Sequence, residues 1–383
     1  MTFFRSRWVS PPDGVEELDA AALAPGFRAA GAACGLKAGG KTDVGLVVCD
    51  HEQVSSALML TRNAAAAAPI RVCRERCDRG SIRAAVVNSG NANAATGEQG
   101  YRDAVAMQET AASAIGVEAS AVAVAETGVI GVPLRIDDVL SGIAEAGAAL
   151  SHLGAENFAR SIMTTDLSEK RCALRLDGVT LSAQAKGAGM IEPGFATMLC
   201  FIQTDAVVEQ PTSALAGAVS ASFERITVDG QMSTNDTVLL QASRQSGKPL
   251  PEGLLEAVCL QLALEIVADG EGASRVGRIL VSGAHDDEEA DLVSRAIARS
   301  PLVKTAVHGR DPNWGRIAQA AGMALAGQEL AEIGAEQIDA RELAGEGVEV
   351  ELSLRLGRGE GHALTYFSDL TKRYIEINAD YTT

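Results

Sequence analysis

The first half of the chain alternates short apolar runs with segments of helical spacing. Residues 84–87 form a short apolar run that leads into the string NSGNANAATG, and apolar side chains then recur at helical spacing over residues 104–115. A second apolar run, residues 121–125, leads directly into Thr127 and Gly128. This pattern predicts a strand, a glycine-rich loop and a helix, followed by a strand whose end carries a loop with exposed backbone amides.

The middle of the chain combines backbone freedom with a continuous apolar run. Residues 186–196 read KGAGMIEPGFA, with three glycines and a proline, and Thr197 then heads the apolar run of residues 198–202. A continuous apolar run favours a strand buried on both faces, although periodicity alone does not distinguish so short a run from a buried helix.

The second half repeats the alternation of helical and extended patterns. Apolar side chains recur at helical spacing over residues 254–266, and residues 279–281 are typical of a strand. Residues 287–299 begin with acidic side chains and end with arginines, as the helix dipole favours. Strands and helices alternate in both halves, so we expect a mixed, layered α/β architecture of two halves. Residues 1–24 lack a steady period and are expected to form a loosely attached leader.

Composition narrows the classes of function. The 383 residues are 47% hydrophobic and carry a formal charge of −17, which opposes binding to nucleic acid or to an anionic membrane surface. An anionic substrate therefore requires a locally placed Lys or Arg. The seven cysteines are scattered among apolar neighbours and are expected to be reduced thiols without a metal. The opening residues lack a secretory signal pattern, and no apolar run is long enough to span a membrane, so we expect a soluble cytoplasmic protein.

Common catalytic motifs do not account for the chain. It has no nucleophile elbow, no phosphate-binding loop ending in Lys-Ser/Thr and no HExxH string. The string NSGNANAATG (residues 88–97) lacks the lysine of a phosphate-binding loop and is interpreted as structural. The most unusual strings are TGVIG, IMTTD, AKGAGMIEPGFATMLCFIQTDA, ITVDGQMSTNDT, DGEGAS, KTAVHGRDPNWGRI and the closing NADYTT.

These strings, in this order, resemble the ornithine acetyltransferase (glutamate N-acetyltransferase) family over residues 26–383. The resemblance implies a precursor that cleaves itself between Ala196 and Thr197, giving an α chain of residues 1–196 and a β chain of residues 197–383. Thr197 would then be the nucleophile. A threonine hydroxyl needs a nearby base, and the α-amine that cleavage creates can supply one. Without the resemblance, Thr197 would be interpreted as the start of a buried strand.

The resemblance also implies an oxyanion site and substrate contacts. The Thr127 hydroxyl and the Gly128 amide would stabilise the negative oxygen that forms when an acetyl carbonyl is attacked. Lys186 would meet a substrate carboxylate and Glu271 the amino end of the substrate. Thr164 of the IMTTD string, together with Asn378 and Thr383 of the closing string, would complete the contacts. Taken singly, Lys186 and Glu271 would more often be solvated surface charges.

The reaction implied is acetyl transfer from N-acetylornithine to glutamate in the cyclic route of arginine biosynthesis, without a metal or organic cofactor. The resemblance further implies an α2β2 assembly. Because the amine of Thr197 would act as the base, His308 is expected to have an organising, hydrogen-bonded role. Three alternatives stay open: acetyl-coenzyme A as a second donor, a self-processing amidohydrolase or aminopeptidase that passes the acyl group to water, and an uncut metabolite-binding protein. A specialised acceptor is also left open.

Overall fold

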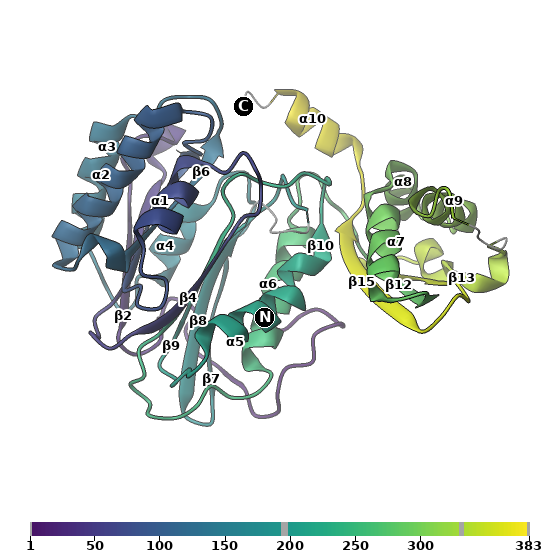
Figure 1. Ribbon diagram of the computed structural model, residues 1–383, viewed down its shortest axis with the longest axis horizontal. Helices are drawn as coiled ribbons and strands as arrows, with labels where there is room; N and C mark the ends of the chain where they lie inside the picture. The colour runs from purple at the N-terminus through teal and green to yellow at the C-terminus, as the bar shows by residue number, and fades with distance from the viewer. Residues whose placement is uncertain (1, 193–197, 329–332, 381–383) are drawn as a thin grey trace.

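The structure is a computed structural model that describes residues 2–192, 198–328 and 333–380. Three sheets and the helices that cover them form the layers drawn in Figure 1. The first sheet has the strand order β2-β3-β5-β6 and carries the parallel pair β5–β6. Its strands are β2 (Phe27–Ala32), β3 (Val44–Cys49), β5 (Ala84–Asn91) and β6 (Val122–Val129), and its helices are α1 (Ala68–Arg76), α2 (Gly97–Ile115), α3 (Ile136–Ala148) and α4 (Ala155–Ile162).

The second sheet lies at the centre of the molecule and has the order β1-β7-β8-β9-β11-β4. Its strands β8, β9 and β11 are buried at every position, and β9 confirms the buried strand predicted from the apolar run of residues 198–202. Helix α4 packs between this sheet and the first one, where the ring of Phe158 meets that of Phe201 edge to face at 5.2 Å. The elements are β1 (Glu16–Glu17), β4 (Ser55–Leu60), β7 (Lys170–Leu176), β8 (Val179–Lys186), β9 (Leu199–Thr204), β11 (Thr237–Ala242), α5 (Pro211–Ser220) and α6 (Leu254–Ala268).

The third sheet, with the order β10-β15-β12-β14-β13, has its own apolar core. Figure 1 shows α10 extending from this layer back toward the first half of the chain. The elements are β10 (Ile226–Thr227), β12 (Val276–Ala284), β13 (Ile338–Asp339), β14 (Glu349–Arg355), β15 (Gly361–Ser368), α7 (Asp287–Arg299), α8 (Pro301–Gly309), α9 (Trp314–Ala324) and α10 (Lys372–Asp380). Short 3-10 helices are η1 (Ala38–Gly40), η2 (Ala119–Ala121), η3 (Phe223–Arg225), η4 (Ala335–Gln337) and η5 (Arg341–Ala344).

The α/β class predicted from the sequence is confirmed, but the strands run further than the apolar pattern indicates. Strand β6 continues through Thr127 and Gly128, which therefore belong to a strand end and not to a free loop. The cause is pairing with β5, because Ser89 and Gly90 lie opposite these two residues and provide backbone partners for polar and glycine positions alike.

The expected division into two chains does not coincide with a division between sheets. Strands β8 and β9 pair antiparallel, with Lys186 opposite Leu199, and β11 pairs with β4 from the first half of the chain. Both expected chains thus contribute strands to the central sheet. The prediction of a loosely attached leader is wrong for residues 2–24, because the irregular pattern still places Phe3 and Val9 in a buried core with strands of the central sheet, and the ring of Trp8 lies 5.4 Å from that of Tyr366.

The close approach of α4 to β3 gives a test of this packing. A Cβ on Gly45 would lie 2.2 Å from Ser161 Oγ and 2.9 Å from a ring carbon of Phe158. We expect Gly45→Ala to destabilise the protein by about 1–3 kcal/mol through overpacking. Gly217→Ala is the matched control, since Gly217 is exposed within α5 with no atom near its would-be Cβ, and it should stabilise by about 0.5–1 kcal/mol. Thermal unfolding measures both, and an unchanged Gly45 variant would contradict the packing.

Candidate functional site

Thr127 and Gly128 lie at the end of β6, pressed against the neighbouring strand. Gly128 has a φ of 134°. A Cβ there would lie 2.3 Å from the carbonyl carbon of Gly90 and 2.5 Å from the nitrogen of Asn91. Glycine is therefore required both for its conformation and for the close approach of two backbones. The Thr127 side chain beside it is almost fully buried.

The asparagines of the string NSGNANAATG direct their side chains into the protein. Asn91 donates to the carbonyl of Val132 at 3.0 Å, and its side-chain oxygen accepts from the amide of Asn93 at 2.8 Å. Asn93 in turn donates to Gly100 O at 2.8 Å and to a carboxylate oxygen of Glu126 at 2.9 Å. These bonds agree with the structural role expected for the string, and they brace the strand end that carries Thr127.

Lys186, the last residue of β8, has its ammonium group inside the protein, with 2% of the residue exposed. Its Nζ donates to Thr127 Oγ1 at 3.3 Å, and it forms no ion pair with any described carboxylate. Burial lowers the pKa of Lys186, and the nearby charge of Asp166 only partly offsets that effect. A buried cation without a paired anion is costly. The site is therefore suited to receive a negative group at this position.

Asp166 joins the loop after α4 to the backbone that follows Lys186. Its Oδ1 accepts from the amide of Gly187 at 2.7 Å and from Lys170 Nζ at 2.8 Å, and its Oδ2 accepts from the amide of Thr164 at 3.0 Å. Although burial alone would raise the pKa of Asp166, the ammonium groups of Lys170 and Lys186 hold it well below its usual range. Lys170 also donates to Asp269 Oδ2 at 2.6 Å.

Glu271 lies beyond α6 and is held by two side chains from distant parts of the chain. Thr165 Oγ1 donates to one carboxylate oxygen at 2.9 Å, and Asn378 Nδ2 of α10 donates to the other at 2.8 Å. The sequence analysis named Glu271, Asn378 and Thr164 as separate substrate contacts. The structure brings Glu271 and Asn378 together, whereas the amide of Thr164 donates to Asp166 and its neighbour Thr165 contacts Glu271. Gly189 lies so close that a Cβ there would be 2.7 Å from the Glu271 carboxyl carbon.

The predicted cleavage site, Ala196 and Thr197, and the terminal Thr383 lie outside the described residues. The backbone of the next described residue, Met198, is bound at both its amide and its carbonyl. The amide donates to Asp236 Oδ1 at 3.1 Å, and the carbonyl accepts from the amide of Thr237 at 3.1 Å. Burial raises the pKa of Asp236 well above its usual range. The preceding Asn235 donates to the carbonyls of Ala92 at 2.7 Å and Glu126 at 2.9 Å.

The sequence did not point to Asp166, Lys170, Asn235 or Asp236. Asp166 lies in the IMTTD string, and Asn235 and Asp236 lie in ITVDGQMSTNDT, so these strings marked the regions without distinguishing the residues that hold the site together. Lys170 lies in none of the unusual strings. His308 is hydrogen-bonded as expected, with its Nδ1 3.0 Å from Asp369 Oδ2. Asp369 also accepts from Ser274 Oγ at 2.5 Å, so His308 belongs to a separate cluster on the third sheet.

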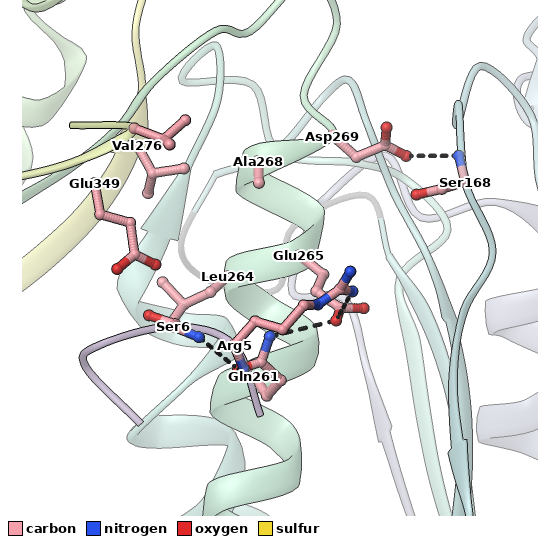
Figure 2. Close-up of a pocket in the computed structure, with 11 residues that line it drawn as sticks. Arg5, Ser6, Ser168, Gln261, Leu264, Glu265, Ala268, Asp269, Val276 and Glu349 are labelled. Carbon is pink, nitrogen blue, oxygen red and sulfur yellow. Dashed lines mark hydrogen bonds and ion pairs between the residues drawn. The ribbon is translucent and has the colours of Figure 1, made fainter. Parts of the chain in front are cut away.

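Two cavities lie beside the carboxylates that pair with Lys170: Asp269 lines one cavity and Asp166 lines the other. Figure 2 shows a cavity of about 530 Å³ between the leader and α6, where Arg5 pairs with Glu265 and Asp269 accepts from the amide of Ser168. It is lined by none of the site residues predicted from the sequence. A cavity of about 730 Å³ adjoins the site directly, because Thr164 and Asp166 line it.

Among the described residues, no helix is both long and apolar enough to cross a membrane.

Comparison with known proteins agrees with the resemblance. A family model described as the ArgJ family matches residues 28–383. The arginine biosynthesis bifunctional protein ArgJ of Thermosynechococcus vestitus is 40% identical, over 94% of this chain and 97% of its own length. Its counterpart in Symbiobacterium thermophilum is 42% identical, with the same two shares. A solved chain of the ornithine acetyltransferase of Mycobacterium tuberculosis, complexed with ornithine, is 38% identical over 47% of this chain and 98% of that chain, with a TM-score of 0.45. A match over nearly the whole sequence places this chain in the ArgJ family.

Proposed function

We propose that this protein transfers an acetyl group from N-acetylornithine to glutamate through an acetyl ester on Thr197, as a step of arginine biosynthesis. The observation that carries the proposal is the buried Lys186 ammonium, which contacts Thr127 and has no paired carboxylate among the described residues. Both substrates are α-amino acids with a carboxylate that this cation can bind. Membership of the ArgJ family and the relatives named for arginine biosynthesis support the same assignment.

The contact between Lys186 and Thr127 suits the proposed oxyanion site. A hydroxyl group has one proton to donate and two lone pairs to accept. Because Thr127 Oγ1 accepts from Lys186 Nζ, its own proton is free to point at a developing oxyanion. The nearby ammonium also stabilises negative charge in a buried site where water does not screen it. Gly128, held against β5, would supply the second donor through its amide.

The nucleophile would be formed by the chain itself. Attack of Thr197 Oγ on the carbonyl of Ala196 forms an ester while the C–N bond between the two residues breaks, and the Oγ proton passes to the α-amine that is freed. Water then hydrolyses the ester, which releases the Ala196 carboxylate and restores the Thr197 hydroxyl, with the α-amine as its base. Asp236 and Thr237 bind the amide and the carbonyl of Met198, the residue that follows Thr197, just before β9 begins.

Glu271 is suited to the amino end of the ornithine side chain. Thr165 and Asn378 each donate one hydrogen bond to it, which fixes the carboxylate plane and leaves lone pairs on both oxygens for an incoming ammonium. The reaction as proposed requires no metal or organic cofactor. Acetyl-coenzyme A as a second donor, an α2β2 assembly and a cytoplasmic location remain expectations from the family resemblance.

The first prediction concerns processing. We expect the purified protein to consist of two chains, the second beginning at Thr197, because only cleavage creates the amine that serves as the base. Thr197→Ala should stay as one chain without transferase activity. Thr197→Ser, which keeps a hydroxyl, should still be cut. Denaturing electrophoresis with N-terminal sequencing measures this, and a full-length active protein would contradict the mechanism at its first step.

A second prediction separates substrate binding from processing. Lys186→Ala should still be cut, since self-cleavage needs no substrate carboxylate, but it should weaken transition-state binding by about 1.5–3 kcal/mol through loss of a shielded charged hydrogen bond. Lys248→Ala is the control, because Lys248 donates to the carbonyl of Asp177 at the opposite end of β8. Equal kcat/KM for the natural protein and the Lys186 variant would remove Lys186 from the substrate site.

The decisive experiment tests the acetyl ester. If acetyl-Thr197 is a discrete intermediate, labelled ornithine must enter N-acetylornithine without any glutamate present. Initial rates with both substrates varied should give parallel double-reciprocal lines. A direct transfer in a ternary complex gives no exchange, and an amidohydrolase releases acetate instead. Full transferase activity without exchange would exclude the ester while keeping the overall reaction.

A further inference from the structure

The cavity of about 730 Å³ beside the site lies between two loops, only one of which contributes to the site described above. One loop precedes β3, contains η1 and contributes Lys37 and Lys41. The other joins α4 to β7 and contributes Thr164 and Asp166, which already belong to the site. Lys186 does not line this cavity, but it lies close enough to Lys37 for the two ammonium groups to repel one another.

The anionic side chains around this cavity are already engaged, whereas two of its cations are not. Asp166 accepts from Lys170 and from the amides of Gly187 and Thr164. Glu169 accepts from Arg160 at 2.5 Å and from Arg171 at 2.9 Å, which also satisfies Arg160. The lysines 37 and 41 are different, because neither forms an ion pair with a described residue.

Lys37 is held in place without being neutralised. Its Nζ donates to the carbonyls of Met163 at 2.9 Å and Arg160 at 3.3 Å, which are uncharged acceptors. Asp43 attracts the charge, but its carboxylate oxygens accept from the backbone amides of Cys34 at 2.7 Å and Lys37 at 2.9 Å. Burial lowers the pKa of Lys37 to about 8, against the attraction of Asp43 and with the repulsion of Lys186. An anion in the cavity would relieve this unfavourable burial of charge.

Lys41 lies at the open side of the same cavity and is exposed. It makes no hydrogen bond to any described residue. Lys37 therefore provides a fixed cation at the wall, and Lys41 a free one at the mouth. In a chain with a formal charge of −17, two uncompensated ammonium groups at the edge of one cavity mark it as a site for a negative ligand.

We propose that Lys37 and Lys41 bind the side-chain carboxylate of the acceptor amino acid, and so select an acidic acceptor. This inference rests on the proposed function. Donor and acceptor share an α-carboxylate for Lys186 but differ in the charge at the end of the side chain. Glu271 would bind the side-chain ammonium of ornithine, and Lys37 and Lys41 would bind the side-chain carboxylate of glutamate. Lys186 would then bind the α-carboxylate of each substrate in turn.

The test compares the two half-reactions in the processed protein. Lys37→Met should raise the KM for glutamate at least tenfold and reduce the preference for glutamate over glutamine at least fivefold. Exchange of labelled ornithine into N-acetylornithine should stay within twofold, since the donor does not use the cavity. Lys41→Gln, at an exposed position where folding is not at risk, should change the same ratio in the same direction by at least threefold. Lys248→Met is the matched control, because it too is a lysine bound to a backbone carbonyl, and it should change neither quantity.

Direct binding separates failure of this inference from failure of the proposed function. Calorimetric titration of the natural protein should show glutamate binding more tightly than glutamine, with the difference lost in Lys37→Met, whether or not acetyl transfer is observed. Equal binding of both amino acids to the natural protein would overturn the inference. An equal fall of exchange and glutamate use in both lysine variants would also overturn it, because the cavity would then serve the donor or the fold.

Discussion

The arrangement of the site depends on one buried ammonium group, that of Lys170. It donates to Asp166 at 2.8 Å and to Asp269 at 2.6 Å, and so joins the loop after α4 to the end of α6. Asp166 also accepts from the amide of Gly187, so the same network fixes the backbone next to Lys186. Removing one member of a buried charge network leaves another charge uncompensated, which typically costs about 3–5 kcal/mol. The network therefore fixes the spacing between the residues proposed to bind the two ends of the substrate.

A second set of hydrogen bonds connects β6, the strand that carries Thr127, to the residue just before β9. Asn235 donates to the carbonyls of Ala92 and Glu126, on either side of the pressed pair β5–β6, while its neighbour Asp236 accepts from the amide of Met198. Two adjacent residues thus fix the position of the strand end at Thr127 relative to Met198. The backbone of Gly128 lies so close to Gly90 that no Cβ fits between them, so this part of the structure has little freedom to relax. Catalysis by preorganised donors requires this kind of rigidity, because a donor that must move into place loses part of its effect.

Periodicity predicted the helices and central strands well, since α6, α7 and β9 fill the positions that their apolar patterns indicate. It failed where backbone pairing decides structure, as at Thr127, because a polar residue and a glycine carry no apolar signal although β5 extends beside them. The site residues named from the family strings include Lys186 and Glu271, whose burial and contacts fit a site. Lys170 and Asn235 were missed because their roles depend on partners 99 and 143 residues away in the chain, which local pattern does not reveal.

The acidity of the chain and its proposed anionic substrates are compatible because electrostatic interactions are local. Exposed charges farther away than about 8 Å are largely screened at physiological salt, so most of the net charge of −17 has little effect inside the site. An ammonium group about 4 Å from a carboxylate contributes roughly 4 kcal/mol at the effective dielectric near a protein surface. Lys186 is buried and lacks a paired described carboxylate, which strengthens its interaction with any anion that reaches it. Selectivity for an anion therefore depends on where the few cations lie and not on how many the protein has.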